Sequence, residues 1–377
     1  MKAVVNAALV IGDAVLLGHS LVFDDKIRGI CGPTAELPSA VSQVFDAEAC
    51  FVSPGFIDIH VHGFAGAYTE SDDLSGVIRM ARKLPATGVT SFLPTTMSHT
   101  IPHLTQILVH IRHAMGERAG AVVLGCHLEG PFISEQARGA HELRFIAPAS
   151  FAPLAGFTDV LKIVTVAPEV QGGAEFVAQC LQAGVKVAIG HTTATYEQAM
   201  ATVESGASLF THVFNAMPPL HHRQPGALGA ALDGDAYCEL IVDNIHVHPA
   251  LQRLLLHAKG AEKIILVTDS TMAGLPDGTY ELHGQSLTVK DNAVRLPSGQ
   301  LAGSALTLDR AVRNFATNTG LSLPQAVQLV TVNPARLLGL LPCKGRLAVG
   351  MDADITIFDA QLNIHRTFVA GECVYRS

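Results

Sequence analysis

Residues 55–62 read Gly-Phe-Ile-Asp-Ile-His-Val-His. Apolar and β-branched residues dominate this stretch, which predicts a buried β-strand. His60 and His62 stand two residues apart near its end, so their side chains point to the same face and both could reach one metal ion. The stretch therefore predicts a strand that carries two imidazoles to one place.

The same kind of strand recurs along the chain. Helix-like stretches lie between several of the strands, for example at 73–86, 101–115 and 174–183. Buried strands that alternate with helices predict a parallel sheet, and eight is the number that closes a (β/α)8 barrel. The rhythm is loosest at 130–160 and 213–237, where we expect long loops. The eight apolar runs are residues 55–62, 89–96, 121–128, 161–168, 185–190, 207–213, 238–243 and 263–268.

The two ends of the chain follow another pattern. Residues 1–53 and 343–377 contain short alternating apolar segments separated by Gly and Asp turns. This pattern predicts a small β-sandwich domain built from both termini, beside a catalytic barrel of residues 54–342.

The first residues could pass for a signal peptide, because one lysine precedes an apolar run. Asn6, Gly12 and Asp13 interrupt that run and no clean cleavage site follows. We therefore favour two short strands around a Gly12-Asp13 turn.

Composition limits the class of protein. The 377 residues are 49% hydrophobic and 15% charged, which supplies a large core and excludes a disordered chain. The net charge of −8 argues against a nucleic-acid partner, and no apolar run is long enough to span a membrane. Seven scattered cysteines without a CxxC pair indicate neither disulfides nor a zinc knuckle, so we expect a cytoplasmic protein. A dinucleotide or ATP fingerprint is absent.

Metal-compatible side chains follow five of the eight predicted strands. Beyond the first strand, the third ends with His127 and Glu129, the fifth at His191, the sixth at His212 and the eighth at Asp269. In a (β/α)8 barrel these strand ends share the face that carries chemistry. Any one of these residues could be structural, and Asp269 could cap a helix. Together, imidazoles and carboxylates without thiolates favour a catalytic site for Zn²⁺, Fe²⁺, Mn²⁺ or Co²⁺.

Other polar residues keep two interpretations. Arg223 could meet an anionic substrate group or belong to a solvated loop, which is the interpretation that we favour for His221 and His222. His246 could line the mouth of the barrel or pack in the core. His141, in a long loop, has no role that its pattern alone assigns.

Five motifs occur in a recognisable order between residue 54 and about residue 309: PGFIDIHVHG, HLEGPF, GHTTAT, THVFNAMPPL and LAGSALTLD. Together they resemble the amidohydrolase superfamily, and within it the N-acetylglucosamine-6-phosphate deacetylase family. The flanking β segments and the stretches 333–336 and 344–355 match the same layout, so the resemblance covers nearly the whole chain.

The resemblance implies a metal-dependent amide hydrolase of class EC 3.5.1 in amino sugar metabolism. Metal-activated water would attack the acetamide of N-acetyl-D-glucosamine 6-phosphate, with Asp269 as general base and acid. One or two divalent ions would bind per subunit, Zn²⁺ first, with Fe²⁺, Mn²⁺ or Co²⁺ as alternatives. The ligands of the principal ion would be Glu129, His191 and His212. Those of a second ion would be His60 and His62, with Glu129 as the bridge.

The resemblance also implies how the phosphosugar is held. His141 would polarise the acetyl carbonyl, and Arg223 would reach across the interface of a homodimer. The substrate-binding residues would be Ala140, His141, Asn215, Ala216, Arg223, His246, Leu301, Ala302 and Gly303.

Three rival functions remain open at this point. The enzyme could deacetylate another N-acetylhexosamine 6-phosphate, such as that of galactosamine. It could be another amidohydrolase, such as an N-acyl amino acid deacylase or, less favoured, a deaminase. The chain could also be a catalytically silent barrel that serves as a binding subunit, although all the metal and acid/base residues are present.

Overall fold

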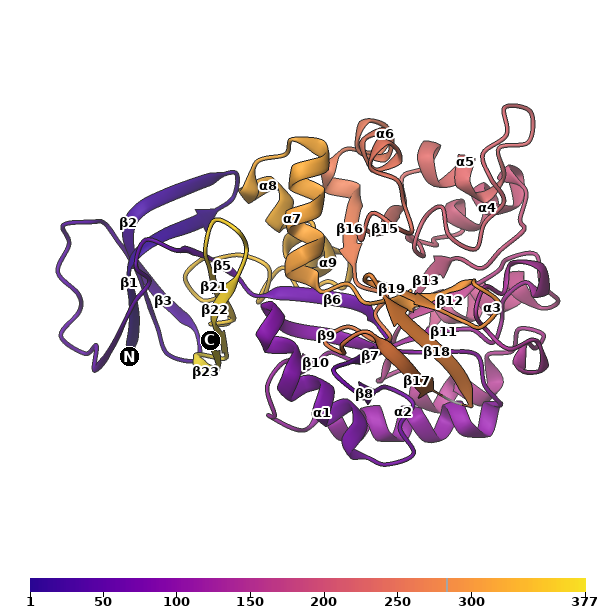
Figure 1. The fold of residues 1–377 in the computed structure, drawn as a ribbon, viewed down its shortest axis with the longest axis horizontal. Coiled ribbons are helices and arrows are strands. Elements are labelled where there is room, and N and C mark those ends of the chain that lie inside the picture. The colour runs from indigo at the N-terminus through magenta and orange to yellow at the C-terminus, as the bar shows by residue number, and fades with distance from the viewer. Residues whose placement is uncertain (283) are drawn as a thin grey trace.

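The computed structural model describes residues 1–282 and 284–377, and the strands predicted from residue 55 onward form a nearly closed parallel barrel (Figure 1). Within that part of the chain, β10 and β11 both pair with β9, so they share the third of eight strand positions. The Asp269 N–H donates to the His60 carbonyl at 2.9 Å, where the last strand meets the first. The barrel strands are β6 (Phe56–Val61), β9 (Val89–Thr96), β10 (Val122–Val123), β11 (Cys126–Glu129), β12 (Leu161–Val166), β13 (Lys186–Ile189), β14 (Leu209–Phe210), β15 (Tyr237–Ile241) and β16 (Ile264–Val267).

Helices cover the outside of the barrel, as the apolar rhythm predicts. The stretch 130–160 contains three short 3-10 helices in place of an α-helix, which confirms the long loop expected there. The α-helices are α1 (Ser75–Lys83), α2 (Ile101–Met115), α3 (Gly173–Gln182), α4 (Tyr196–Glu204), α5 (Gly226–Asp233), α6 (Pro249–Lys259), α7 (Leu308–Thr319), α8 (Leu323–Gln328) and α9 (Val332–Leu337).

Both termini build one β-domain, shown at the left of Figure 1. Its sheet runs β23-β22-β21-β5-β1-β2-β3, and β4 also pairs with β1. If this sheet were flat, β2 and β22 would lie about 19 Å apart, yet the rings of Phe23 and Phe368 meet at 5.4 Å. The sheet therefore folds over its own core, as a sandwich does. Its strands are β1 (Lys2–Ile11), β2 (Ala14–Phe23), β3 (Ile27–Cys31), β4 (Gln43–Asp46), β5 (Phe51–Pro54), β21 (Ile355–Phe358), β22 (Ile364–Val369) and β23 (Glu372–Arg376).

Buried hydrogen bonds join the two parts of the molecule. Thr356 and Thr367 donate their hydroxyl hydrogens to the carbonyls of Gly88 and Pro85 at 2.8 and 2.7 Å. Within the barrel itself, the Asn333 amide donates to the carbonyls of Ala261 and Ile264, at the start of β16. The boundaries 53/54 and 342/343 stay predictions.

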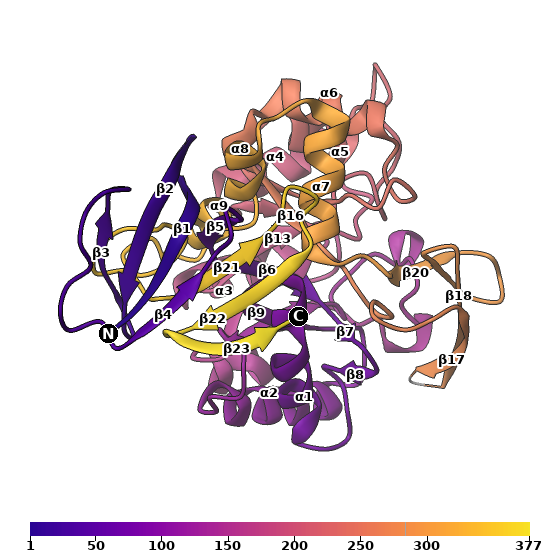
Figure 2. The same cartoon turned by 60° about the vertical axis from the view of Figure 1, so that its left-hand side comes forward.

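A second antiparallel sheet, which the strand rhythm did not predict, follows β16. It consists of β17 (Gly278–Leu282), β18 (Gln285–Lys290), β19 (Ala293–Arg295) and β20 (Leu301–Ser304), and it packs on a small apolar cluster of its own. Figure 2 shows it projecting from the barrel on the side away from β1, β2 and β3. A short hairpin of β7 (Gly63–Phe64) and β8 (Ala67–Tyr68) lies after β6.

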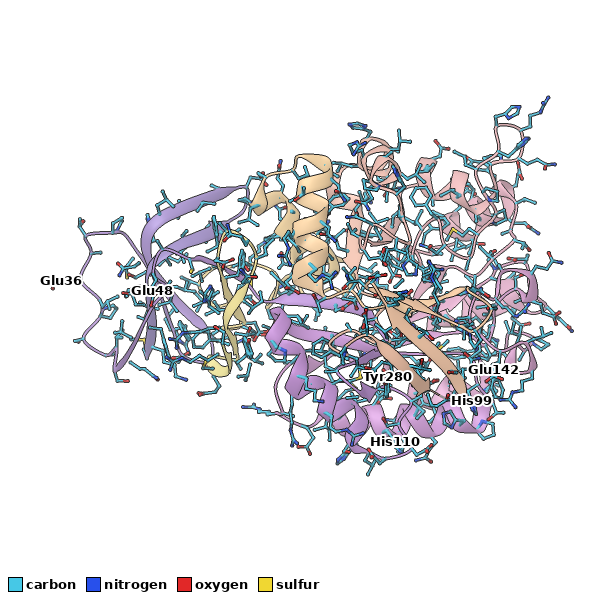
Figure 3. All side chains as sticks on the ribbon, in the orientation of Figure 1. Glu36, Glu48, His99, His110, Glu142 and Tyr280 are labelled. Atoms are coloured by element: carbon cyan, nitrogen blue, oxygen red, sulfur yellow. The ribbon has the colours of Figure 1, made fainter. Side chains whose placement is uncertain are left out.

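Figure 3 marks the extent of the molecule, with Glu36 and Glu48 in the terminal domain and His99 and Glu142 at the far side of the barrel. No helix in residues 1–282 and 284–377 combines the length and the apolar character needed to cross a bilayer.

Candidate metal centre and active site

The ends of β11, β13 and β14 bring three predicted ligands together. Oε1 of Glu129 lies 3.2 Å from Nε2 of His191 and 3.0 Å from Nε2 of His212, and the two Nε2 atoms are 3.0 Å apart. All three side chains are buried. Neighbouring ligands of a tetrahedral zinc ion lie about 3.3 Å apart, given zinc–nitrogen bonds of about 2.0 Å. The spacing therefore suits one shared divalent ion.

The first strand places a second pair of imidazoles beside this group. Nε2 of His60 and Nε2 of His62 are 3.3 Å apart, and Nε2 of His62 lies 3.3 Å from Oε2 of Glu129. Oδ1 of Asp269 lies 3.1 Å from Nε2 of His62. Oε1 of Glu129 also lies 3.5 Å from Nε2 of His60. The carboxylate therefore lies between the two halves of the cluster, which suits a group that bridges two ions.

Hydrogen bonds fix which ring nitrogen is free to bind a metal. Nδ1 of His62 and Nδ1 of His191 lie 3.1 and 2.9 Å from the carbonyls of Thr95 and Ala137, and a carbonyl only accepts. Nδ1 therefore carries the hydrogen, and in the neutral ring the Nε2 lone pair faces the cluster. Nδ1 of His60 likewise donates to the carboxylate of Glu239, so its Nε2 also faces the cluster. Lone pairs that converge in this way fit a cation, so the donor set passes the test for a metal site.

His141 has the opposite arrangement. The backbone N–H of Ser98 donates to its Nδ1 at 3.0 Å, so this nitrogen must accept. Burial lowers the pKa of His141 to about 4, so the ring is neutral and its hydrogen is on Nε2. That nitrogen lies 3.4 Å from Oε2 of Glu129. His141 is therefore placed to donate a hydrogen bond beside the cluster and not to bind an ion.

The backbone is strained where the strands deliver these groups. His191, His212 and Asp269 have φ values of 47°, 26° and 47°, in the left-handed region that costs a non-glycine residue about 1–3 kcal/mol. Gly130 also has a positive φ, and a Cβ there would lie 2.2 Å from Oγ of Ser98, the partner of His141. A side chain at Gly130 would therefore displace Ser98, the residue that sets the orientation of His141.

The cluster polarises its own carboxylates. Burial alone would raise the pKa of Asp269, but the nearby His60 and His62 outweigh it and hold the pKa well below its usual range. The pKa of Glu129 is lowered in the same way by His60 and His191. Burial would lower the pKa of His62, but Asp269 and Glu129 raise it to about 9. The imidazoles thus supply positive charge beside the two carboxylates, a role that a bound cation would take over.

A cavity of about 420 Å³ opens above the cluster. Among the predicted residues that line it are Glu129, His141, His191, His212 and Asp269 at the cluster end, and Ala140, Asn215, Ala216, His246, Leu301 and Gly303 further out. His60 lies beneath its floor and Ala302 lines an adjoining pocket. Arg223 is exposed and does not line the cavity of its own chain.

Comparison with known proteins gives this arrangement a family. Residues 51–374 match the amidohydrolase family. The chain belongs to the amidohydrolase family. That family is metal-dependent, and the cluster of His60, His62 and Glu129 could bind a metal ion.

Three similar proteins are named for the reaction that they catalyse. The chain is 38% identical to N-acetylglucosamine-6-phosphate deacetylase of Bacillus subtilis over 96% of this chain and 93% of that one. It is 35% identical to N-acetylgalactosamine-6-phosphate deacetylase of Escherichia coli O157:H7, over 93% and 94%. The structure of a Mycobacterium smegmatis N-acetyl-D-glucosamine-6-phosphate deacetylase mutant, in complex with N-acetyl-D-glucosamine-6-phosphate, superposes with a TM-score of 0.88 at 32% identity, covering 99% of each chain.

Four polar residues of this amidohydrolase site were missed by sequence reasoning. Arg295 and Gln300, on the inserted sheet and its last turn, line the cavity. Asp243 holds His246, because its carboxylate lies 2.6 Å from the ring Nδ1. Glu239 is buried beneath the cluster. Only the Asp243-Asn-Ile-His246 spacing offered a clue, since an acidic residue three positions before a histidine can bond to it within one turn.

His127 follows the same strand as Glu129 but takes another position. Its two ring nitrogens bond to the Ile59 carbonyl and the Thr165 hydroxyl at 2.9 and 2.7 Å, inside the barrel. Both nitrogens are therefore occupied, and His127 does not join the Nε2 cluster.

Proposed function

We propose that this chain hydrolyses the acetamide of N-acetyl-D-glucosamine 6-phosphate to glucosamine 6-phosphate and acetate. The observation that carries the proposal is the convergence of Glu129, His191 and His212 beside Asp269 and a hydrogen-donating His141 at one end of a 420 Å³ cavity. Similarity to N-acetylglucosamine-6-phosphate deacetylases over most of the chain supports the substrate.

The metal ligands divide into two sets in this proposal. Glu129, His191 and His212 would hold the principal ion, and His60 and His62 would hold a second ion together with Glu129. We expect Zn²⁺, with Fe²⁺, Mn²⁺ or Co²⁺ as alternatives, because the donors are imidazole and carboxylate without thiolate. When bound, such an ion supplies a Lewis acid and makes water a nucleophile at neutral pH.

The chain's own residues then move the protons. Asp269 is a carboxylate at neutral pH, because its pKa lies well below its usual range, so it can accept a proton from the attacking water. It can pass that proton to the departing amine. His141 donates a hydrogen bond from its Nε2–H to the acetyl oxygen, where negative charge develops. Its low pKa keeps this hydrogen-bond donor neutral near pH 7.

The outer part of the cavity holds the sugar phosphate. His246, whose ring is held by Asp243, lines the cavity and would bind the phosphate. Ala140, Asn215, Ala216, Leu301, Ala302 and Gly303 would contact the sugar. Arg223 would act from the partner in a homodimer; that assembly and a cytoplasmic location stay predictions.

A second substrate has one specific observation in its favour. The similarity to the Escherichia coli O157:H7 N-acetylgalactosamine-6-phosphate deacetylase is nearly as high as that to the glucosamine enzymes. The galacto configuration is therefore the alternative that a test must include.

The test is acetate release from four compounds: N-acetylglucosamine 6-phosphate, N-acetylgalactosamine 6-phosphate, unphosphorylated N-acetylglucosamine and an N-acetyl amino acid. We expect the highest kcat/KM for the first. A preference for the second would support the alternative, and activity restricted to the unphosphorylated compounds would contradict both.

A further inference from the structure

One carboxyl group beneath the metal cluster has no part in the proposed reaction. Glu239, on β15, is 0% exposed and lies inside the barrel. Its Oε2 accepts a hydrogen bond from Nδ1 of His60 at 2.9 Å and another from the backbone N–H of His212 at 3.2 Å. One oxygen atom thus contacts two of the proposed ligand residues.

The other oxygen of Glu239 has no matching contact. Oε1 has no hydrogen-bond partner among residues 1–282 and 284–377, and Nδ1 of His127 lies 3.9 Å away from it. A buried carboxylate that is hydrogen bonded on one side only is costly, because it has lost its hydration. A glutamine could accept the same two hydrogen bonds through its single oxygen, so hydrogen bonding alone does not require a carboxylate here. A cation bound at the cluster would stabilise the negative charge of the Glu239 carboxylate, which a neutral glutamine amide could not offer.

The contact to His60 determines what that ring can bind. Because Nδ1 faces Glu239, Nε2 faces His62 and Glu129 at 3.3 and 3.5 Å. A carboxylate behind a ligating imidazole fixes the ring orientation and tautomer and makes the ligand more basic. His212 is contacted only through its backbone N–H, which steadies the left-handed residue without touching its ring.

We propose that Glu239 is a positioning residue for the ion bound by His60, His62 and Glu129. It orients His60 and adds negative charge behind it, whereas its effect on the ion at Glu129, His191 and His212 is indirect and smaller. This inference rests on the two-ion site of the proposed function. It predicts that the two ions respond differently to a change at residue 239.

The experiment compares metal binding by wild type, Glu239→Gln, Glu239→Ala and Thr165→Val. Thr165 is also buried in the barrel interior, and its hydroxyl bonds to His127 and Thr211. Its backbone pairs with that of Glu129, but its side chain has no hydrogen bond to a proposed ligand, so replacing the hydroxyl is a matched control. Metal-free protein is titrated with Co²⁺ against a competing chelator while the visible spectrum of Co²⁺ is followed. Bound ions per subunit are counted by mass spectrometry, and anomalous diffraction assigns each ion to its ligands.

We expect two bound ions in wild type and in Thr165→Val. In Glu239→Gln the hydrogen bonds persist and the charge is lost, so the ion at His60 and His62 should bind about 10-fold more weakly. In Glu239→Ala it should bind about 100-fold more weakly, in line with the loss of other groups that support metal ligands. The affinity of the other ion should change less than about 3-fold.

Equal weakening of both ions, wild-type affinities in both Glu239 variants, or a wild type that binds only one ion would each overturn the proposal. If the alanine variant fails to fold, the isosteric glutamine variant still decides the question. Failure of the proposed function is distinguishable, because ions that bind and respond as expected in a protein that releases no acetate would contradict the activity and leave the role of Glu239 standing.

Discussion

The direction of one hydrogen bond distinguishes His62 and His191 from His141 in this site. His62 and His191 donate from Nδ1 to carbonyls and so present a bare Nε2. His141 accepts at Nδ1 from a backbone N–H and so presents an Nε2 that carries hydrogen. In the proposed function, residues of one type within one cluster would thereby be divided between metal ligands and a hydrogen-bond donor.

This division predicts the behaviour of His141→Ala. Loss of one donor to the developing negative charge costs about 2.7–4 kcal/mol, so kcat should fall about 100- to 1000-fold. The number of bound ions, measured by mass spectrometry, should not change. His110→Ala, which alters a buried histidine on α2 away from the cavity, is the control. Loss of an ion in the His141 variant would show that His141 is a ligand.

Asp269→Asn tests the proton carrier. Asparagine tolerates the left-handed backbone at this position, so the fold should be kept. General base and acid catalysis contributes about 10²–10⁴-fold, and kcat for acetate release should fall by that factor while the principal ion stays bound. Near-normal turnover would refute the role assigned to Asp269.

The individual site residues were predictable to the extent that they end strands. His60, Glu129, His191, His212 and Asp269 each follow an apolar run, and parallel strands of a barrel bring their ends together. Glu239 gave no comparable clue, because it interrupts an apolar run in the middle of β15. Nothing in the sequence around His141 indicates that Ser98, 43 residues earlier, sets its tautomer.

At the scale of elements, the inserted sheet of β17–β20 contributes a wall of the cavity. It was not predicted because its strands alternate polar and apolar residues around a small core of their own. We assigned residues 54–342 to the barrel alone, so no second sheet was expected among them. The inserted sheet places the cation Arg295 in the lining of the cavity of the same chain. The predicted Arg223 does not line that cavity.

This placement predicts that Arg295→Ala raises KM for the phosphorylated sugar about 10-fold or more, since one hydrogen bond to a charged group contributes about 1.5–3 kcal/mol. KM for the unphosphorylated sugar should change little. Lys290→Ala removes a cation from the same sheet but outside the cavity lining, and serves as the control. Equal losses on both sugars would remove Arg295 from the phosphate site.

At the scale of the whole molecule, ion pairs connect the two ends of the chain. Lys26, after β2, pairs with Asp352, and Lys344 pairs with Asp352 and Asp354. Burial would raise the pKa of Asp352, but the hydrogen bond from Lys26 and the charge of Lys344 lower it. The resemblance of residues 344–355 to the superfamily layout thus corresponds to a structural cluster in the terminal domain.

A carboxyl group whose pKa is lowered in the folded state stabilises the protein above its unfolded pKa, near 3.8, and loses that contribution as the pH falls through the folded value. Asp352→Asn should therefore lower the unfolding free energy by about 1.5–3 kcal/mol at neutral pH. The difference from wild type should shrink below about pH 4. Urea unfolding at several pH values measures this, with Glu36→Gln, an exposed carboxylate of the same domain, as the control. A difference that is independent of pH would contradict the ion-pair explanation.

The most direct measurement is anomalous diffraction at the zinc edge from crystals of the zinc-loaded protein. We expect a strong peak within about 2.0–2.2 Å of a Glu129 oxygen and of the Nε2 atoms of His191 and His212. A crystal of fully active protein with no peak between those three residues would contradict it.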